Sequence, residues 1–285
     1  IVILGHLPAG IQVAEAVRAD DPGAVIMVFS AAGELPCEGL GLPDLLRPEG
    51  PAEGGVFRSA AALQKAGIEI RKDPVRRINF KRGRLITEEK EEIPFDHCLI
   101  TDLGWLPPEG VKGCNRTGVI LRNHPEQFRW ARKEMPYIET AIVEAQDLFG
   151  LRTVAALLAA GKEVKWVTPG PRPLAGLLDH ETAEFLSGYL AGQGVEVITE
   201  NPIREVLGDN EVKAIKLASG KVLAAQLVFL SALSADLRIL SSTGLHVSDA
   251  GLGVDPAGAT NEPGVFALGP LAEDPYHNRY QDFDS

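Results

Sequence analysis

Short apolar runs recur along the chain, and each is bounded by glycine or by polar residues. Residues 1–4 form one such run; a glycine turn follows at 5–10, and apolar residues have helical spacing over 11–19. A second apolar run occupies residues 24–29. This order of strand, turn, helix and strand predicts a βαβ unit with buried parallel strands.

The same pattern returns in the middle of the chain. Residues 140–143 are β-prone, residues 150–160 have helical spacing and end at a glycine, and residues 163–167 form another apolar run. Both copies then continue in one order, over 63–101 and 185–230: a short helix, a Gly-x-Glu-x strand, a proline, a polar hairpin and a buried strand. An internal duplication of a nucleotide-binding-type domain explains this ordered series most simply.

The pattern therefore predicts an α/β fold of two doubly wound, Rossmann-like, dinucleotide-binding-type domains, with the second inserted into the first. A last apolar run at 264–269 follows the second copy and has no helix of its own. We expect this run to return to the first sheet. The predicted boundaries are 1–115 with 250–285 for the first domain and 116–249 for the second.

Composition narrows the possible partners and the compartment. The 285 residues carry a net charge of −11, which argues against a nucleic-acid surface or an anionic membrane surface. No apolar run approaches the ~18 residues that span a bilayer. The three cysteines, Cys37, Cys98 and Cys114, form no CxxC pair, so neither a disulfide framework nor a zinc site is expected. The low cysteine count fits a reducing cytoplasm.

The chain resembles the pyridine nucleotide-disulfide oxidoreductases, in particular their rubredoxin reductase and nitrite-reductase-like flavoprotein branch. Residues 1–10, 42–46, 93–96 and 264–269 carry the likeness, which covers nearly the whole chain. The resemblance implies an FAD-binding domain that is interrupted by an NAD(P)H-binding domain. It also implies that FAD takes hydride from a nicotinamide and passes electrons to a redox protein, a quinone or a partner subunit of a larger complex.

The resemblance places an FAD site at the first turn and at the ends of several strands. The implied cofactor-binding residues are Gly5, His6, Leu7, Pro8, Ala9, Gly10, Ser30, Gly104, Gly269 and Pro270. Several of them depart from the family pattern. Leu7 stands at the middle glycine of the Gly-x-Gly-x-x-Gly turn, and Ser30 stands where an acid usually holds the adenosine ribose. Pro270 replaces an aspartate that holds the flavin in the family.

The second glycine motif departs further. Asp147 occupies its middle-glycine position, where a carboxylate would repel a pyrophosphate. Thr168 ends the following strand, where NAD enzymes often carry glutamate. Arg172 follows closely, and we interpret it as a solvated loop residue rather than as a ligand of a 2′-phosphate. We therefore expect NAD(P)H to bind weakly or not at all.

These departures leave other interpretations open. The chain is either an active FAD-dependent NAD(P)H oxidoreductase or a degenerate member that serves as a scaffold or nucleotide-binding subunit of a complex. A third hypothesis is a binder of a single ADP-like moiety at the first turn. Cys37 is a weak candidate for a redox residue, because it has no partner cysteine nearby. We interpret the basic segment 71–84 as the solvated face of a hairpin. The alternative is that this segment forms a docking surface for an acidic redox protein.

Overall fold

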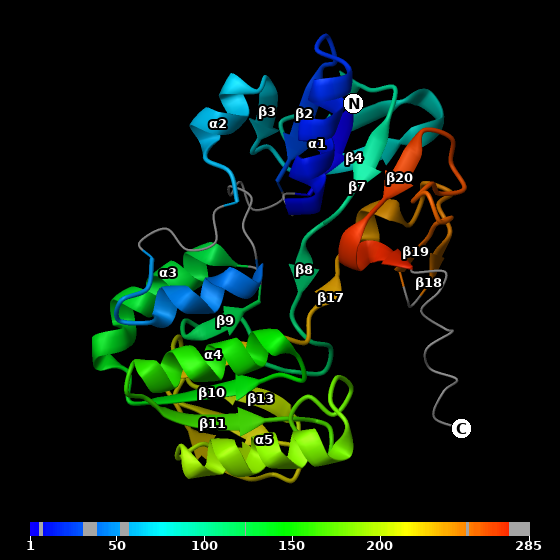
Figure 1. Cartoon of the computed structure of the whole chain (residues 1–285). Coiled ribbons are helices and arrows are strands. Elements are labelled where there is room, and N and C mark those ends of the chain that lie inside the picture. The colour runs from blue at the N-terminus through cyan, green and yellow to red at the C-terminus, as the bar shows by residue number, and fades with distance from the viewer. Residues whose placement is uncertain (6–7, 31–38, 52–56, 123, 249–250, 274–285) are drawn as a thin grey trace. The chain divides into compact units, whose positions relative to one another are not determined.

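The chain forms two compact units, each built around a parallel sheet (Figure 1). The computed structural model describes residues 1–5, 8–30, 39–51, 57–122, 124–248 and 251–273. The first unit comprises Ile1–Glu38, Val56–Trp105 and Ala235–Ser285, and the second comprises Gly39–Gly55 and Leu106–Ser234. The chain changes unit at β8 (Trp105–Leu106) and β17 (Ser234–Ala235), which pair as a two-stranded sheet.

A five-stranded parallel sheet forms the centre of the first unit, in the order β20-β7-β1-β2-β3. Its strands, in that order, are Val265–Ala267, Cys98–Ile100, Val2–Leu4, Ile26–Phe29 and Ile68–Arg71. Helix α1 (Pro8–Asp20) connects β1 to β2, and α2 (Ala60–Lys65) leads into β3. All three residues of β1 are apolar because this central strand is buried on both faces. Strand β20 pairs with β7, so the apolar run near the C-terminus does return to the first sheet.

An antiparallel sheet of three strands completes the first unit. It consists of β4 (Val75–Asn79), β5 (Arg84–Thr87) and β6 (Glu92–Pro94). Its inward residues Ile78, Leu85 and Ile93 share one buried cluster with Val2 and Leu4 of the parallel sheet. The smaller elements of this unit are η2 (Phe80–Arg82), η4 (Arg238–Leu240), β18 (Val247–Ser248), β19 (Gly251–Gly253), η5 (Gly269–Leu271) and β21 (Ala272–Glu273).

The basic segment 71–84 supplies β4 and the residues on either side of it. Arg76, Arg77, Lys81 and Arg82 are exposed, while Ile78 and Phe80 are buried between them. Alternation of this kind is typical of a strand with one solvated face, which agrees with the interpretation of a solvated hairpin.

The second unit has the same design. Its parallel sheet runs in the order β12-β11-β10-β16-β9, with strands Glu196–Ile198, Glu163–Val167, Thr140–Glu144, Leu227–Leu230 and Val119–Leu121. The helices are α3 (Pro125–Glu134), α4 (Leu148–Ala159) and α5 (His180–Gly192), with the short η3 (Met135–Tyr137) after α3. Helix α4 packs on β10 and β11, and Figure 1 shows it beside β10. The antiparallel strands are β13 (Ile203–Leu207), β14 (Ala214–Leu217) and β15 (Val222–Ala224).

The two units therefore repeat one topology. The order β20-β7-β1-β2-β3 corresponds strand by strand to β9-β16-β10-β11-β12. Each unit also carries a three-stranded antiparallel sheet whose first strand shifts register, between Val75 and Arg77 in one and between Ile203 and Glu205 in the other. This agreement confirms the predicted α/β fold of two doubly wound units and the predicted repeat of one order of elements, for which an internal duplication stays the simplest explanation.

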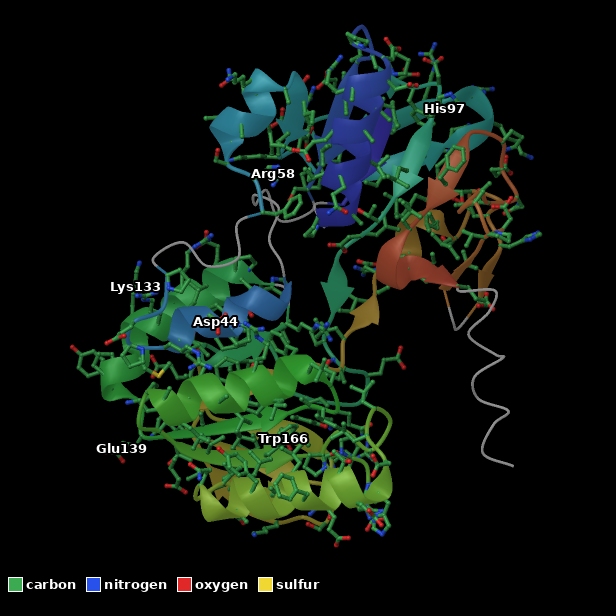
Figure 2. The ribbon with its side chains drawn as sticks, viewed as in Figure 1. Asp44, Arg58, His97, Lys133, Glu139 and Trp166 are labelled. Carbon is green, nitrogen blue, oxygen red and sulfur yellow. The ribbon has the colours of Figure 1, made fainter. Side chains whose placement is uncertain are left out.

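The compact units differ from the predicted boundaries at three places. Residues 39–55 and 106–115 group with the second unit, and residues 235–249 group with the first. Element η1 (Gly39–Leu46) packs on α3 and α4, where Leu42 and Leu45 are fully buried. Asp44 of η1, labelled in Figure 2, accepts a hydrogen bond of 2.5 Å from Arg152 of α4. A loop following the first βαβ unit is thus packed against the second unit's helices, which local sequence pattern cannot show.

Candidate functional site

A crevice of about 490 Å³ lies at the carboxyl ends of β1, β2 and β7 in the first unit. We call it the first-unit crevice; its lining includes Gly5, Ser30, Val75, Arg76, Asp102 and Arg238. The chain leaves β1 toward β2 on one side, while β7 flanks β1 on the other. Open α/β sheets bind ligands at such a switch point, outside the carboxyl ends of the strands.

Gly5 makes the tight turn after β1 possible. Its φ is +109°, and a Cβ atom there would lie 2.4 Å from the backbone nitrogen of Asp102. Only glycine avoids both the strain and the collision. Gly10 permits close packing of α1 on the sheet, because a Cβ there would already lie 3.1 Å from Ile3 and 3.2 Å from Thr101. These two glycines keep their expected structural roles.

Helix α1 begins at Pro8, directly after this turn, and its first turn contains no acidic residue. The missing N–H of proline costs nothing at a helix start, because the first N–H groups have no partner within the helix. The start of α1 therefore keeps the character of an anion-binding helix N-terminus. His6 and Leu7 precede it and lie outside the described residues, as does Cys37.

Ser30 and the two later glycines occupy different places. Ser30 directly follows β2, is 1% exposed and lines the first-unit crevice. Gly104 has a φ of +93°, and its N–H donates to the Asp102 carboxylate at 2.8 Å. Gly269 has a φ of +78° at the start of η5. Neither glycine lines the crevice, and the side chain of Pro270 is outside the described residues.

Several charged residues of this crevice were not predicted from the sequence. Asp102 follows β7 and is 2% exposed, and Glu88 and Asp236 line the same crevice. Arg238 donates from Nε to Asp236 at 2.7 Å, and this hydrogen bond lowers the pKa of the Asp236 carboxyl. An acid just beyond an apolar strand was the available signal for Asp102. No local pattern indicates Asp236 or Arg238, since they come from a distant part of the chain.

The residues of the first-unit crevice fit the FAD that the resemblance implies. The acid-free start of α1 suits a pyrophosphate, and Gly5 lets the backbone come close to it. Carboxylates accept hydrogen bonds from ribose hydroxyls and from an adenine amino group, which are the donors of an adenosine.

A second crevice, of about 240 Å³, lies at the carboxyl ends of β10 and β16 in the second unit. We call it the second-unit crevice; Glu144, Gln146, Asp147 and Ser231 are its polar lining residues. Asp147 is the N-cap of α4, and its Oδ1 accepts a hydrogen bond of 3.0 Å from the N–H of Gly150. Its Oδ2 accepts a hydrogen bond of 2.5 Å from Arg122, which follows β9. A carboxylate therefore lies at the start of α4, where the motif of a dinucleotide-binding turn has its middle glycine, and it does not suit the pyrophosphate of NAD(P)H.

Glu144 places a second acid in this crevice. It is the last residue of β10 and is 7% exposed. Burial raises the pKa of its carboxyl to about 7, against the opposing effects of the Ile203 N–H and of the Arg204 charge. Within the described ranges, its Oε2 atom has no hydrogen-bond partner.

Thr168 and Arg172 follow β11. Thr168 is fully buried, and its hydroxyl oxygen accepts a hydrogen bond of 3.2 Å from the N–H of Gly170. Arg172 is half-buried in the loop and does not line the second-unit crevice.

The cysteines in the described part of the chain show no sign of redox chemistry. Cys98 is buried in β7, Cys114 is half-buried, and both are free. Burial raises the pKa of both thiols, which disfavours the reactive thiolate. The described segments contain no group of His, Cys, Asp and Glu side chains arranged to hold a metal ion. None of their helices is long and apolar enough to span a bilayer.

Known proteins similar to this chain include reductases of redox proteins. A nitric oxide reductase FlRd-NAD(+) reductase of Vibrio vulnificus is 24% identical over 283 residues, which cover 96% of this chain and 72% of that protein. The ferredoxin–NAD(+) reductase subunit of a benzene 1,2-dioxygenase system of Pseudomonas putida is 22% identical, covering 98% of this chain and 68% of that subunit. A solved covalent complex of putidaredoxin reductase with putidaredoxin has a TM-score of 0.85 at 22% identity, covering 95% of this chain and 67% of that one.

The model of one family, the pyridine nucleotide-disulphide oxidoreductases, matches residues 1–282. Proteins of this family are FAD-binding reductases that use NAD(P)H, and those similar to this chain include reductases of redox proteins. The match confirms the predicted resemblance and, at the level of the family, the predicted flavoprotein oxidoreductase chemistry. The chain belongs to the pyridine nucleotide-disulphide oxidoreductase family.

Proposed function

We propose that the chain binds FAD in its first unit and works as a flavoprotein oxidoreductase. A reduced redox protein or partner subunit would reduce the FAD, and the electrons would pass on to another redox protein, a quinone or a partner subunit. The observation that carries this proposal is the first-unit crevice, which Gly5 of the glycine turn lines, together with the acid-free start of α1 that follows this turn in the chain. The reductases similar to this chain support the choice of a redox protein as the acceptor.

The residues of the first unit would bind and orient the cofactor. The first N–H groups of α1 would donate to the pyrophosphate, at a distance that Gly5 and Gly10 make possible. Ser30, buried at the end of β2, would donate its hydroxyl to the adenosine ribose. When bound, FAD supplies the redox chemistry, and the protein supplies position and electrostatics.

A second candidate function is a non-catalytic subunit that keeps the fold as a scaffold. One specific observation favours it: the Asp147 carboxylate caps α4 and pairs with Arg122 in the unit that would otherwise bind a nicotinamide nucleotide. The scaffold hypothesis and the flavoprotein hypothesis differ in whether the first unit holds FAD.

We further propose a reducing compartment, the cytoplasm, as the location of the protein. The free thiols of Cys98 and Cys114 support this proposal, because structural disulfides are favoured in oxidising compartments.

The test is the flavin content of the protein as purified, measured from the visible absorbance of the protein and from FAD released on denaturation. The proposal expects a yellow protein with one FAD per chain. A matched pair of variants then locates the site. Gly10→Val places a branched side chain against Ile3 and Thr101. Gly188→Val alters a helical glycine of α5 where an added Cβ atom would have no neighbouring atom within 4 Å. The first variant should lose FAD and the second should keep it. Equal FAD content in both variants would remove the first-unit crevice as the site.

A further inference from the structure

We infer that Asp147 closes the second unit to nicotinamide dinucleotides, because its carboxylate, held by Arg122, takes the place of the ligand's pyrophosphate at the start of α4. NADH and NADPH are therefore not ligands of the second-unit crevice. This inference goes beyond the proposed function, since it concerns the unit that does not hold the flavin.

One of the free N–H donors at the start of α4 already has a hydrogen-bond partner within the chain. Asp147 Oδ1 accepts from the N–H of Gly150 at 3.0 Å, which pairs one of the donors that a helix N-terminus offers to an anion. The negative charge of the carboxylate also offsets the positive end of the helix dipole. A dinucleotide that enters the crevice would have to displace this carboxylate.

Arg122 holds the carboxylate in that place. Its Nη1 donates to Asp147 Oδ2 at 2.5 Å, and its guanidinium lies 5.4 Å from the centroid of the Phe149 ring. Both side chains of the ion pair are 32% exposed, so the pair sits at the mouth of the crevice rather than in the core. The charge of Arg122 is thus neutralised by the chain's own Asp147.

The charge of the lining adds to this exclusion. Glu144 and Asp147 line the second-unit crevice, and its described lining contains no lysine or arginine. A pyrophosphate would meet two acidic side chains where dinucleotide-binding turns present glycine and N–H groups. The first-unit crevice also contains acids, Glu88, Asp102 and Asp236, but it differs in two ways: α1 starts without an acid, and two arginines, Arg76 and Arg238, line the space.

The surrounding turn still has dinucleotide-binding geometry. A Cβ atom on Gly150 would lie 2.1 Å from the Cβ atom of Ala145, so α4 approaches the end of β10 as closely as the last glycine of such a motif allows. Because the backbone keeps this approach, removal of one side chain is expected to reopen the site. Arg122 would then be free to donate to a phosphate.

The test compares four forms of the full chain by calorimetric titration with NADH and with NADPH. The native chain should bind both more weakly than about 1 mM. Asp147→Gly should bind at least ~10-fold more tightly, because glycine is tolerated at an N-cap and leaves room for the phosphate. Adding Arg122→Ala to that variant should abolish the gain. Asp179→Gly, which removes the matching N-cap of α5, should behave as the native chain does.

Two results would overturn the inference: low-micromolar affinity of the native chain for either nucleotide, or a folded Asp147→Gly chain with no gain in affinity. If Asp147→Gly does not fold, Asp147→Ser replaces it, since serine is a good N-cap with a shorter side chain and no charge. Asp147→Ser should then gain affinity, and its failure to do so would contradict the inference equally. FAD content is measured on the same samples, so a failure of the proposed flavin site gives a separate result.

Discussion

Replacing Gly150 with alanine tests the close approach of α4 to β10. The added Cβ atom would lie 2.1 Å from Ala145 Cβ and 3.6 Å from Trp166 Cζ2, whereas ordinary contact begins near 3.4 Å. Ala145 cannot yield freely, because it is 2% exposed and its carbonyl accepts a hydrogen bond of 2.8 Å from the Trp166 indole. The helix or the turn must therefore shift by more than an ångström.

The expected loss in the free energy of unfolding follows from two opposing effects. Overpacking of a dense core costs about 1–3 kcal/mol, and occasionally more. Alanine regains up to about 1 kcal/mol over glycine within a helix, and less in the first turn, where Gly150 lies. We expect the second unit to lose about 2 kcal/mol. Gly188→Ala is the matched control, because Gly188 lies inside α5 and an added Cβ atom there would have no neighbour within 4 Å. This variant should gain up to about 1 kcal/mol in the free energy of unfolding.

Urea unfolding followed by tryptophan fluorescence measures both variants. Trp166, labelled in Figure 2, is fully buried in β11 and reports on the second unit. The two substitutions should move the unfolding midpoint in opposite directions. If Gly150→Ala is as stable as the native chain, α4 does not approach β10 this closely. Asp147→Gly would then not be expected to reopen a dinucleotide-binding turn.

Four further predictions concern Glu144, Arg18, the flavin site and Cys37. Burial raises the pKa of Glu144 from 4.5 to about 7, so between these pH values the folded chain holds a proton that the unfolded chain releases, and the native chain loses stability as the pH rises. The free energy of unfolding of Glu144→Gln, measured in urea, should therefore rise relative to that of the native chain by roughly 3 kcal/mol from pH 4.5 to pH 8. The same difference between the two chains at both pH values would refute this. The Arg18 guanidinium donates hydrogen bonds to four backbone carbonyls at 3.0 Å or less, and a lysine ammonium cannot reach all four. Arg18→Lys should therefore lower the free energy of unfolding of the first unit by about 2 kcal/mol in urea titrations. An unchanged unfolding midpoint would contradict this prediction. Leu7→Gly combined with Pro270→Asp restores two family residues and should tighten FAD binding, so that this variant loses less FAD on dialysis than the native chain; a folded double variant without FAD would favour the scaffold hypothesis. Cys37→Ser should leave any reductase activity largely intact, and a folded variant without activity would show that the thiol takes part in the reaction.

Much of the fold could be predicted because buried parallel strands are marked in the sequence by short apolar runs. The strands β11 and β16 were expected at 163–167 and 227–230, and the structure has them at Glu163–Val167 and Leu227–Leu230. Helix α4 was expected at 150–160 but begins at Leu148, because the side chain of Asp147, the residue directly before Leu148, caps the helix. Helix α3 was not predicted, since its mean hydropathy is low and only Pro125, Phe128 and Ala131 are buried.

The sites were harder to predict, because distant segments build them. The position of Asp147 in the motif indicated a conflict with pyrophosphate, but its partner Arg122 lies 25 residues earlier, directly after strand β9. Asp236 and Arg238 reach the first-unit crevice only because the chain returns to the first unit after β17. Spacing within one motif carries no information about such pairs, whereas the order of strands within each sheet brings them together.

The amount of FAD in the purified full chain decides between the flavoprotein hypothesis and the scaffold hypothesis. We expect one FAD per chain, with visible flavin absorbance that disappears in Gly10→Val and persists in Gly188→Val. A colourless native chain that is folded, and that takes up no FAD when FAD is added, would contradict the claim and leave the scaffold hypothesis.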